Sequence, residues 1–262
     1  MWDLWTDNFH NVISRAEAVY NGNAQLRLTR PSMRVRLRYL CFVALILRPP
    51  ANVQLPTAVQ SQKWRVVRIA ESQNDGFHFL ATGFALVRNQ KAYVITSRHI
   101  LEKVKDQAKL YADFVPPVGA HPATILAADP LADILILGTD AKPQEDPVER
   151  IGVGKVGARV FIVGFDDIHM TRNTLNTDSG IIQRVGRWVE QQHLLVISGQ
   201  HEGPSAHDLL ISGVTCRLGG SGSPVFGTDG QILAVVKGTT DDGKCLAIGL
   251  EHALQLLEQY AK

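Results

Sequence analysis

The segment GGSGSPVF, residues 219–226, places Ser221 in a glycine-rich turn between two apolar runs. A serine hydroxyl alone is a poor nucleophile. It needs an imidazole to accept its proton, and the imidazole needs a carboxylate to hold its tautomer. The charge that develops during acyl transfer also needs backbone N–H donors, and glycine lets the backbone come close enough to supply them. Acyl transfer at Ser221 therefore requires a histidine and an aspartate from elsewhere in the chain.

Both residues occur next to apolar runs that read as strands. His99 follows AYVITSR, and Asp133 directly precedes ILILG, so the chain order is His, Asp, Ser. His99 is one of nine histidines, and its place at a predicted strand end separates it from the others. Asp129 is the alternative to Asp133, but an aspartate before a proline is a natural turn former. We predict that His99, Asp133 and Ser221 form one site.

The elements that would position these residues are short runs rich in Val, Ile, Phe and Leu. They begin near Trp64, and turn residues separate most of them. Strands that follow one another without intervening helices favour an all-β barrel or sandwich over βαβ units. The end of the chain differs, because Leu250, Ala253, Leu254 and Leu257 fall at helical spacing. We expect an all-β body followed by a C-terminal helix.

The first sixty residues have another pattern. MWDLWTDNFHNVISRAEAVYNG could form one amphipathic helix, and four arginines then precede the apolar run Tyr39–Leu47. If Met33 is the true start, residues 33–47 resemble a secretory signal or an anchor that contacts the membrane. An ordinary buried strand or a surface-bound segment explains the run equally well. A secreted or periplasmic location is favoured, with a cytoplasmic location as the alternative.

Composition excludes several classes of function. The 262 residues are 45% hydrophobic and 20% charged, which is typical of a globular protein with a real core. The net charge of +2 gives no bulk field for nucleic acid. Three cysteines without a CxxC pair make a zinc site of the common spacing improbable. We expect no metal and no cofactor. Cys216 and Cys245 could form a disulfide in an exported protein, but independent small core residues are the favoured interpretation.

Four blocks in the same order resemble trypsin-like serine peptidases of the chymotrypsin fold, and most closely the bacterial HtrA/Deg-type branch without a PDZ domain. The blocks are ATGFALVRNQKAYVITSRHIL, AADPLADILIL, GGSGSPVFGTDGQILAVVKG and KCLAIGLEHALQLLEQ. The resemblance implies two antiparallel six-stranded β-barrels with the site between them. The implied division is an N-terminal extension over 1–62, a first barrel over 63–149, a second barrel over 150–249 and a C-terminal helix over 250–262.

The resemblance also implies roles for residues and a polypeptide substrate. His99 would be the general base, Asp133 its orienter and Ser221 the nucleophile. The oxyanion hole would consist of Gly219, Gly220 and Ser221, with Gly219 and Ser221 as the N–H donors. The implied substrate-binding residues are Thr215, Cys216, Val236, Lys237 and Gly238. No acidic residue lies just before Leu218, so a basic P1 side chain is not indicated and a small or aliphatic one is expected.

The chain departs from the family in three places, and two other functions stay open. Arg98 stands where a small residue is usual, Gly220 replaces an aspartate of the digestive enzymes, and Ser223 replaces a glycine. The first alternative is a non-catalytic trypsin-like domain that binds peptides or protein partners. The second is an esterase, which is disfavoured because GGSGS lacks the final glycine of GxSxG and a strand follows it. Residue types alone leave the oligomeric state open.

Overall fold

The computed structural model describes residues 54–74, 76–116, 118–142, 150–165, 175–189, 194–196, 207–214, 216 and 218–260. The helix expected within residues 1–22 and the signal-like or anchor-like segment 33–47 lie outside these ranges. The described chain begins with a short helix, α3 (Thr57–Gln60), and a 3-10 turn, η1 (Lys63–Arg65). Val59 of α3 is fully buried, so this part of the predicted extension belongs to the folded body.

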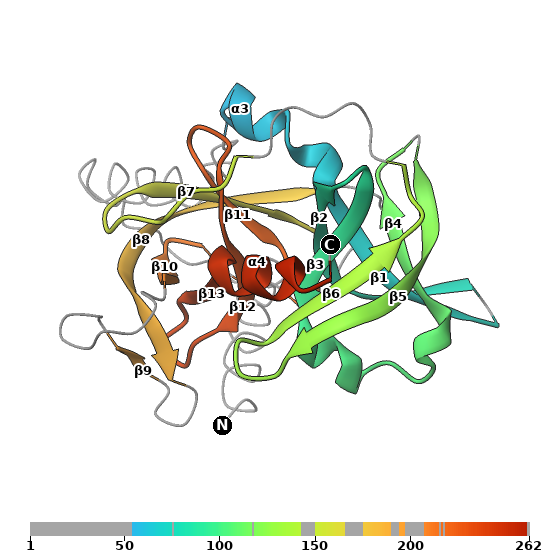
Figure 1. The fold of residues 1–262 in the computed structure, drawn as a ribbon. Coiled ribbons are helices and arrows are strands. Elements are labelled where there is room, and N and C mark those ends of the chain that lie inside the picture. Colours follow the sequence, from blue (N-terminus) through green and yellow to red (C-terminus); the bar gives the residue numbers. More distant parts are fainter. Residues whose placement is uncertain are drawn as a thin grey trace, which may run out of the picture. The chain divides into compact units, whose positions relative to one another are not determined.

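Six antiparallel strands close into the first barrel, in the order β1-β2-β3-β6-β5-β4 (Figure 1). The 3-10 helices η2 (Arg98–Glu102) and η3 (Gln107–Lys109) connect β3 to β4. Closure leaves no sheet edge unpaired, which is how small barrels avoid exposed strand edges. The strands are β1 (Val66–Gln73), β2 (Gly76–Arg88), β3 (Lys91–Ser97), β4 (Leu110–Phe114), β5 (Gly119–Asp129) and β6 (Ile134–Thr139).

The second barrel is built on the order β10-β13-β12-β11-β7-β8-β9, and a further pairing of β10 with β8 closes six of these strands. The strand β9 pairs with β8 at the end of this order. The prediction of two six-stranded antiparallel barrels is confirmed. The strands are β7 (Arg159–Gly164), β8 (Asn176–Val189), β9 (Leu194–Val196), β10 (Asp208–Ser212), β11 (Pro224–Gly227), β12 (Ile232–Thr239) and β13 (Cys245–Gly249).

Strands at the junction of the barrels are apolar on both faces. Successive side chains of a strand point to opposite sides, and along β6 Leu135 belongs to the core of the first barrel while Ile136 packs against residues of the second. The shared cluster includes Phe84 from the first barrel and Phe161 and Phe226 from the second. This double burial explains why these segments read as continuous apolar runs instead of alternating ones.

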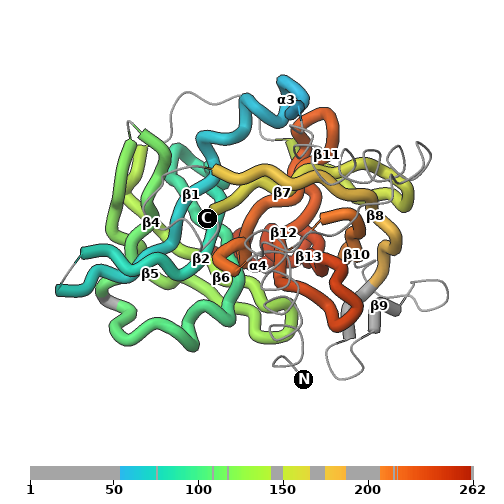
Figure 2. The backbone as a smooth tube through the Cα atoms, turned by 180° about the vertical axis from the view of Figure 1, so that it is seen from behind, coloured from blue at the N-terminus to red at the C-terminus, as the bar shows by residue number. Residues whose placement is uncertain are grey.

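The C-terminal helix α4 (Leu250–Glu258) follows β13 directly, and its prediction is confirmed. Leu250, Ala253 and Leu257 are buried and belong to the cluster that the two barrels share. Figures 1 and 2 show α4 beside β12 and β13 when the fold is viewed from either side. The helix therefore covers the junction where strands of both barrels meet.

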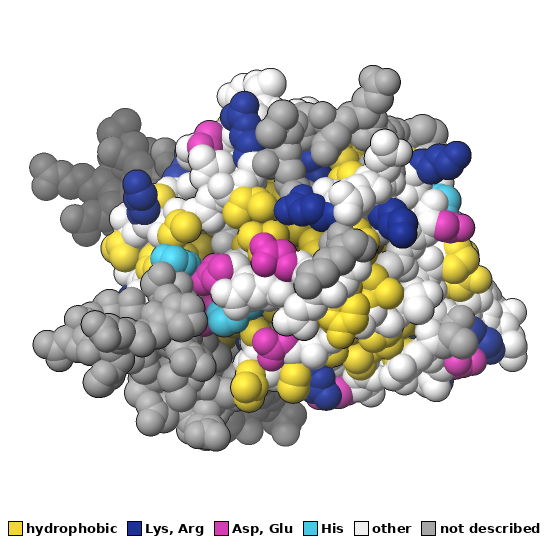
Figure 3. Space-filling model, viewed as in Figure 1, with side chains coloured by type: hydrophobic (Ala, Val, Ile, Leu, Met, Phe, Trp, Pro, Cys, Tyr) yellow, Lys and Arg dark blue, Asp and Glu magenta, His cyan; other side chains and the backbone are white. Residues whose placement is uncertain are grey.

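The surface carries both signs of charge. On the face drawn in Figure 3, Lys and Arg side chains are interspersed with Asp and Glu side chains. Within the described ranges, no helix has the length and apolar character required to span a bilayer. Over the same ranges, no three or more His, Cys, Asp or Glu side chains are grouped so that they could hold a metal ion.

Candidate active site

The first barrel brings His99 and Asp133 together through strand register. Ser97, the last residue of β3, pairs with Ile134, the first residue of β6. His99 lies two residues beyond Ser97 in η2, and Asp133 lies one residue before Ile134. Because β3 and β6 are antiparallel, both residues leave the sheet at the same end. Adjacent strand ends thus place an imidazole beside a carboxylate.

Asp133 uses both carboxylate oxygens on His99. Its Oδ2 lies 2.7 Å from His99 Nδ1, and its Oδ1 accepts the backbone N–H of His99 at 2.8 Å. The Asp133 side chain is 8% exposed, whereas that of His99 is 33% exposed. An acceptor at Nδ1 favours the tautomer that carries its proton there, which leaves Nε2 free to accept one.

The two aspartates of DPLAD, just before β6, make different hydrogen bonds. Asp129 Oδ1 accepts the N–H groups of Leu131 and Ala132 at 2.8 and 3.0 Å, so this carboxylate caps the turn. Asp133 itself adopts a positive φ of 58°, which is uncommon for a residue other than glycine. Its carbonyl accepts the Arg98 N–H at 2.9 Å, so the strained residue is held on both sides.

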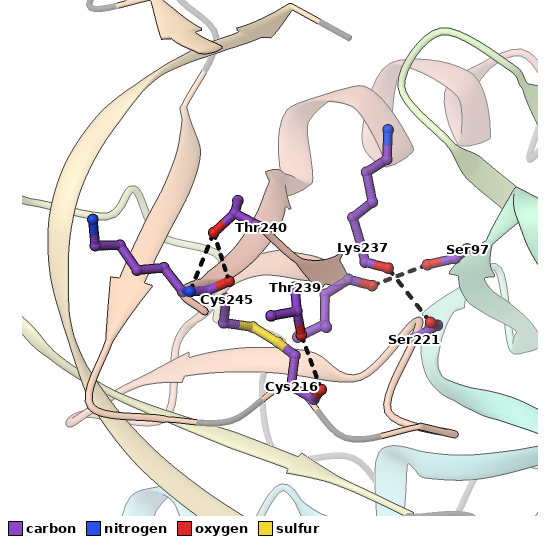
Figure 4. The surroundings of a disulfide bond; sticks show 9 residues. Ser97, Cys216, Ser221, Lys237, Thr239, Thr240 and Cys245 are labelled. Carbon is purple, nitrogen blue, oxygen red and sulfur yellow. Dashed lines mark hydrogen bonds between the residues drawn. A yellow bond between two sulfur atoms is a disulfide. The ribbon is translucent and has the colours of Figure 1, made fainter. Parts of the chain in front are cut away.

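Ser221 completes a hydrogen-bonded chain that begins at Asp133. Its Oγ lies 3.0 Å from His99 Nε2 and 3.4 Å from the carbonyl oxygen of Lys237. Figure 4 shows that the Lys237 carbonyl points toward Ser221 while the Lys237 side chain points away. The imidazole is the nearer of the two acceptors for the serine proton. The arrangement is suited to proton transfer from the hydroxyl to Nε2.

The segment Leu218–Ser223, here called the nucleophile loop, owes its shape to two glycines. Gly219 has a φ of 86° and Gly222 a φ of 84°, a region that L side chains rarely adopt. A Cβ on Gly222 would also lie 2.1 Å from the Thr82 carbonyl oxygen. Only glycine fits there. The close approach lets Gly222 donate its N–H to the Val236 carbonyl at 2.8 Å.

The predicted oxyanion-hole residues lie in this loop. Among the described residues, the N–H groups of Gly219 and Ser221 donate to no protein oxygen. Ser223 donates its own N–H to the Gly220 carbonyl at 3.0 Å, which turns that carbonyl into the loop. These two N–H groups, which have no acceptor among the described residues, are compatible with an oxyanion hole, and the assignment of that role stays a prediction.

Two residues of the first barrel contact the site and were not singled out in the sequence. Thr82 on β2 hydrogen-bonds to Gly219 and Ser221, and Ser97 on β3 donates its hydroxyl to the Val236 carbonyl at 2.9 Å. Both lie within ATGFALVRNQKAYVITSRHIL, the block that carries the family resemblance. The resemblance of that block to the family was the sequence signal near these residues, but it did not indicate what they contact.

One of the predicted substrate-binding residues, Cys216, takes part in a disulfide. Cys216 and Cys245 are bonded, with a Cα–Cα distance of 5.4 Å, so the prediction of independent cysteines is wrong (Figure 4). The reason is sheet register: β12 pairs with β13 so that Thr239 lies opposite Cys245, and the Thr239 hydroxyl donates to the Cys216 carbonyl at 3.1 Å. Sequence separation alone does not show this proximity.

The remaining predicted binding residues take different positions. Thr215 lies outside the described residues. Val236 is buried, and its carbonyl accepts the hydrogen bonds from Ser97 and Gly222. Gly238 is half-buried, and a Cβ there would meet no atom of the described residues within 4 Å. The binding roles of these residues stay predictions.

Comparisons with known proteins agree with this architecture. The family profile described as a trypsin-like peptidase domain matches residues 81–235, which include all three residues of the hydrogen-bonded chain. No protein with a curated description matches the sequence.

Three solved structures share the fold. The inactive form of the Rv3671c protease of Mycobacterium tuberculosis is 22% identical with a TM-score of 0.58, covering 80% of this chain and 95% of that one. A serine endoprotease from Yersinia pestis is 18% identical with a TM-score of 0.57, covering 80% and 67%. The MamO protease domain of Magnetospirillum magneticum is 18% identical with a TM-score of 0.57, covering 74% and 96%.

Proposed function

The chain belongs to the trypsin-like peptidase family, and from this premise we propose that it is a serine endopeptidase that cleaves polypeptides through an acyl-enzyme on Ser221. The observation that carries the proposal is the continuous hydrogen-bonded chain from Asp133 through His99 to Ser221, with distances of 2.7 and 3.0 Å.

In the proposed reaction, Ser221 Oγ attacks the carbonyl carbon of the scissile peptide bond while its proton moves to His99 Nε2. Asp133 holds the imidazole through Nδ1 and stabilises the imidazolium that forms. The N–H groups of Gly219 and Ser221 bind the oxyanion of the tetrahedral intermediate. The imidazolium then gives its proton to the leaving amine, which breaks the C–N bond and leaves the acyl group on Oγ.

Deacylation repeats these steps with water. His99 Nε2 takes a proton from the attacking water, and the acyl–Oγ bond breaks as that proton returns to Ser221. The His99 side chain is 33% exposed, which supports access for both leaving group and water. No metal or cofactor takes part in this scheme, and its substrate is a polypeptide.

The proposal is tested by labelling with a fluorophosphonate probe, read by peptide mass spectrometry. The wild-type protein is expected to carry the adduct on Ser221, and His99→Ala is expected to lose at least about 100-fold in labelling rate because no base accepts the proton. Ser223→Ala is the matched control. Ser223 lies two residues away in the same loop, and its hydroxyl has no hydrogen-bond partner among the described residues.

Ser223→Ala is expected to label at the wild-type rate, and Ser221→Ala not at all. Folding of each variant is checked by circular dichroism. A folded wild-type protein without adduct would overturn the proposal and favour the alternative of a trypsin-like domain that binds peptides without cleaving them.

A further inference from the structure

A buried threonine of the first barrel reaches across the barrel junction to the nucleophile loop. Thr82 lies on β2 and is completely buried. Its Oγ1 accepts the Phe165 N–H at 2.9 Å and lies 3.0 Å from the Gly219 carbonyl oxygen and 3.3 Å from that of Phe165. One hydroxyl thus joins two separate segments of the second barrel.

The hydrogen-bond inventory of a hydroxyl decides where its proton goes. A threonine hydroxyl has one O–H donor and two lone pairs. The Phe165 N–H occupies one lone pair, so the proton remains available for one of two carbonyls. The Gly219 carbonyl is the nearer by 3.0 against 3.3 Å. The hydroxyl therefore donates to Gly219, the residue that precedes Gly220 and Ser221.

The backbone of Thr82 holds the other side of the same loop. Its N–H donates to the Ser221 carbonyl at 3.1 Å, and its own carbonyl accepts the Thr96 hydroxyl at 2.7 Å. The carbonyls of Gly219 and Ser221 are therefore both fixed by one residue. Between them lies the peptide that joins Gly220 to Ser221, whose carbonyl is tied to the Ser223 N–H.

Each N–H group of the loop shares a peptide plane with the carbonyl of the residue before it. A trans peptide is planar, so its N–H points opposite to its carbonyl. The Ser221 N–H is thus directed by the tie between Gly220 and Ser223. The Gly219 N–H depends on the torsions of a glycine, which has little intrinsic preference of its own. Its orientation needs an external anchor on the Gly219 carbonyl.

We propose that Thr82 is a positioning residue whose hydroxyl, by holding the Gly219 carbonyl, sets the backbone torsions of Gly219 and so directs the Gly219 N–H toward the oxyanion. This inference rests on the proposed function. Phe165 N–H would lose its acceptor and the Gly219 carbonyl its donor if the hydroxyl were removed. The torsions of Gly219 could then turn its N–H away from the oxyanion.

The test uses p-nitrophenyl acetate, whose burst of p-nitrophenol counts acylated sites independently of side-chain preference. The burst amplitude reports the fraction of assembled sites, and the burst rate reports acylation per site. Thr82→Val keeps the shape but removes the hydroxyl, and Thr82→Ser restores the hydroxyl. Thr139→Val is the matched control, because Thr139 lies at the opposite end of β6 from Asp133 and its hydroxyl accepts the Ala141 N–H at 3.2 Å.

Thr82→Val is expected to acylate about 10- to 100-fold more slowly per site. Complete loss of one oxyanion-hole donor costs about 100-fold or more, and a misdirected donor should cost up to about that much. Thr82→Ser and Thr139→Val are expected to stay within about threefold of wild type, which corresponds to a modest positional change. A purely structural role would lower the burst amplitude and leave the rate unchanged. If Thr82→Val does not fold, Thr82→Cys carries the same expectation, since a thiol is a weak donor.

Wild-type acylation rates in Thr82→Val, or equal losses in Thr82→Val and Thr82→Ser, would overturn the proposal while leaving the proposed function intact. A folded wild-type protein with neither burst nor fluorophosphonate adduct would instead overturn the proposed function, and the role of Thr82 with it.

Discussion

At the scale of single residues, Asp133 combines an uncommon backbone with a fully occupied carboxylate. Its positive φ of 58° is accompanied by three hydrogen bonds, two to His99 and one from Arg98 to its carbonyl. Strained conformations persist where the surroundings overdetermine them, and they concentrate at functional sites. Asn tolerates the same region as Asp. The backbone can therefore survive a change that alters only the carboxylate.

Asp133→Asn is expected to lower the rate of p-nitrophenyl acetate acylation by about 1,000- to 10,000-fold, the size of effect known when a triad aspartate becomes an amide. The amide can still accept the His99 backbone N–H through its oxygen, but its NH2 group cannot accept the Nδ1 proton. The imidazole would then adopt the wrong tautomer. Stopped-flow measurement of the burst rate, together with circular dichroism, separates this loss from unfolding.

Asp129→Asn is the matched control for that experiment. An asparagine oxygen can accept the N–H groups of Leu131 and Ala132 as the carboxylate does. Its acylation rate should stay within about twofold of wild type because the turn is preserved. Inverted results, with a slow Asp129 variant and a normal Asp133 variant, would refute the assignment of the orienter.

Ser223 is a residue at which a substitution is expected to stabilise the fold. Its side chain is fully buried, and its Oγ has no hydrogen-bond partner among the described residues. A buried hydroxyl without a partner costs free energy, so Ser223→Ala should raise the free energy of unfolding by up to about 1 kcal/mol. Urea unfolding followed by fluorescence measures this change. A loss of 1 kcal/mol or more would show that the hydroxyl has a stabilising partner.

Residue types allowed the site members to be predicted but not the contacts that hold them. His99, Asp133 and Ser221 each stand beside a strand in a pattern that acyl transfer requires, and the structure places them within hydrogen-bonding distance. The bond from Thr82 to Gly219 joins residues 137 positions apart. No local pattern encodes such a pair. The disulfide was misjudged for the same reason, because strand register decides it.

At the scale of elements, the segment after η2 is anchored to β1 by one glutamate. Glu71 is buried, and its Oε1 accepts the backbone N–H groups of Asp106 at 2.6 Å and Lys105 at 2.9 Å. The Gln73 amide donates to Oε2. The pKa of Glu71 is lowered by these hydrogen bonds, chiefly by the Asp106 N–H and then by the Gln73 amide and the Lys105 N–H. Desolvation of the carboxylate opposes this effect. The segment that Glu71 holds begins shortly after η2, the 3-10 helix that carries His99.

A lowered pKa makes Glu71 a source of pH-dependent stability. Because the folded-state pKa lies below the ordinary value of 4.5, ionised Glu71 stabilises the fold above about pH 4.5, and this contribution is lost as the pH falls through the folded-state value. Glu71→Gln should therefore melt at a lower temperature than wild type at pH 7. The difference should shrink progressively below pH 4.5.

Calorimetry at a series of pH values checks this expectation. Glu102→Gln is the control, since the Glu102 side chain is 72% exposed and should show no comparable dependence. The difference in melting temperature between wild type and Glu71→Gln could instead stay constant down to pH 3.5, about one unit below the usual glutamate pKa. That result would rule out stabilisation by ionised Glu71.

Strand existence was more predictable than strand pairing. The runs that form β3, β6 and β12 are long and apolar, so the sequence indicates each of them as a strand without knowledge of its partners. The short strand β11 (Pro224–Gly227) has four residues and directly follows the glycine-rich turn, so it forms no long apolar run of its own. The pairing of β10 with β8, which closes the second barrel, depends on segments far apart in sequence.

At the scale of the whole molecule, the site is shared between the two barrels. His99 and Asp133 come from the first barrel and Ser221 from the second, while Ser97 and Thr82 hydrogen-bond across the junction. A buried apolar cluster, which includes Phe84 and Phe226, lies beneath these bonds. The family resemblance in four blocks predicted this arrangement, whereas composition alone predicted only an all-β body.

The disulfide constrains the part of the second barrel that contains the nucleophile loop. Cys216 and Cys245 are 29 positions apart in the sequence, and Ser221 lies between them. Chain-entropy arguments for a loop of this length predict that Cys216→Ser with Cys245→Ser lowers the free energy of unfolding by about 3 to 4 kcal/mol. Urea unfolding with and without dithiothreitol measures it. Identical wild-type curves under both conditions would show that the cysteines are not bridged.

The division of the site between barrels has a consequence for biosynthesis. The ribosome makes the chain from its N-terminus, and domains generally fold as they emerge. A nascent first barrel already carries His99 and Asp133, but it has no hydroxyl for them to act on. Ser221 appears later, and the loop around it is tied to β12, which in turn pairs with β13. The growing polypeptide and its neighbours therefore meet an incomplete site until translation has passed Gly249.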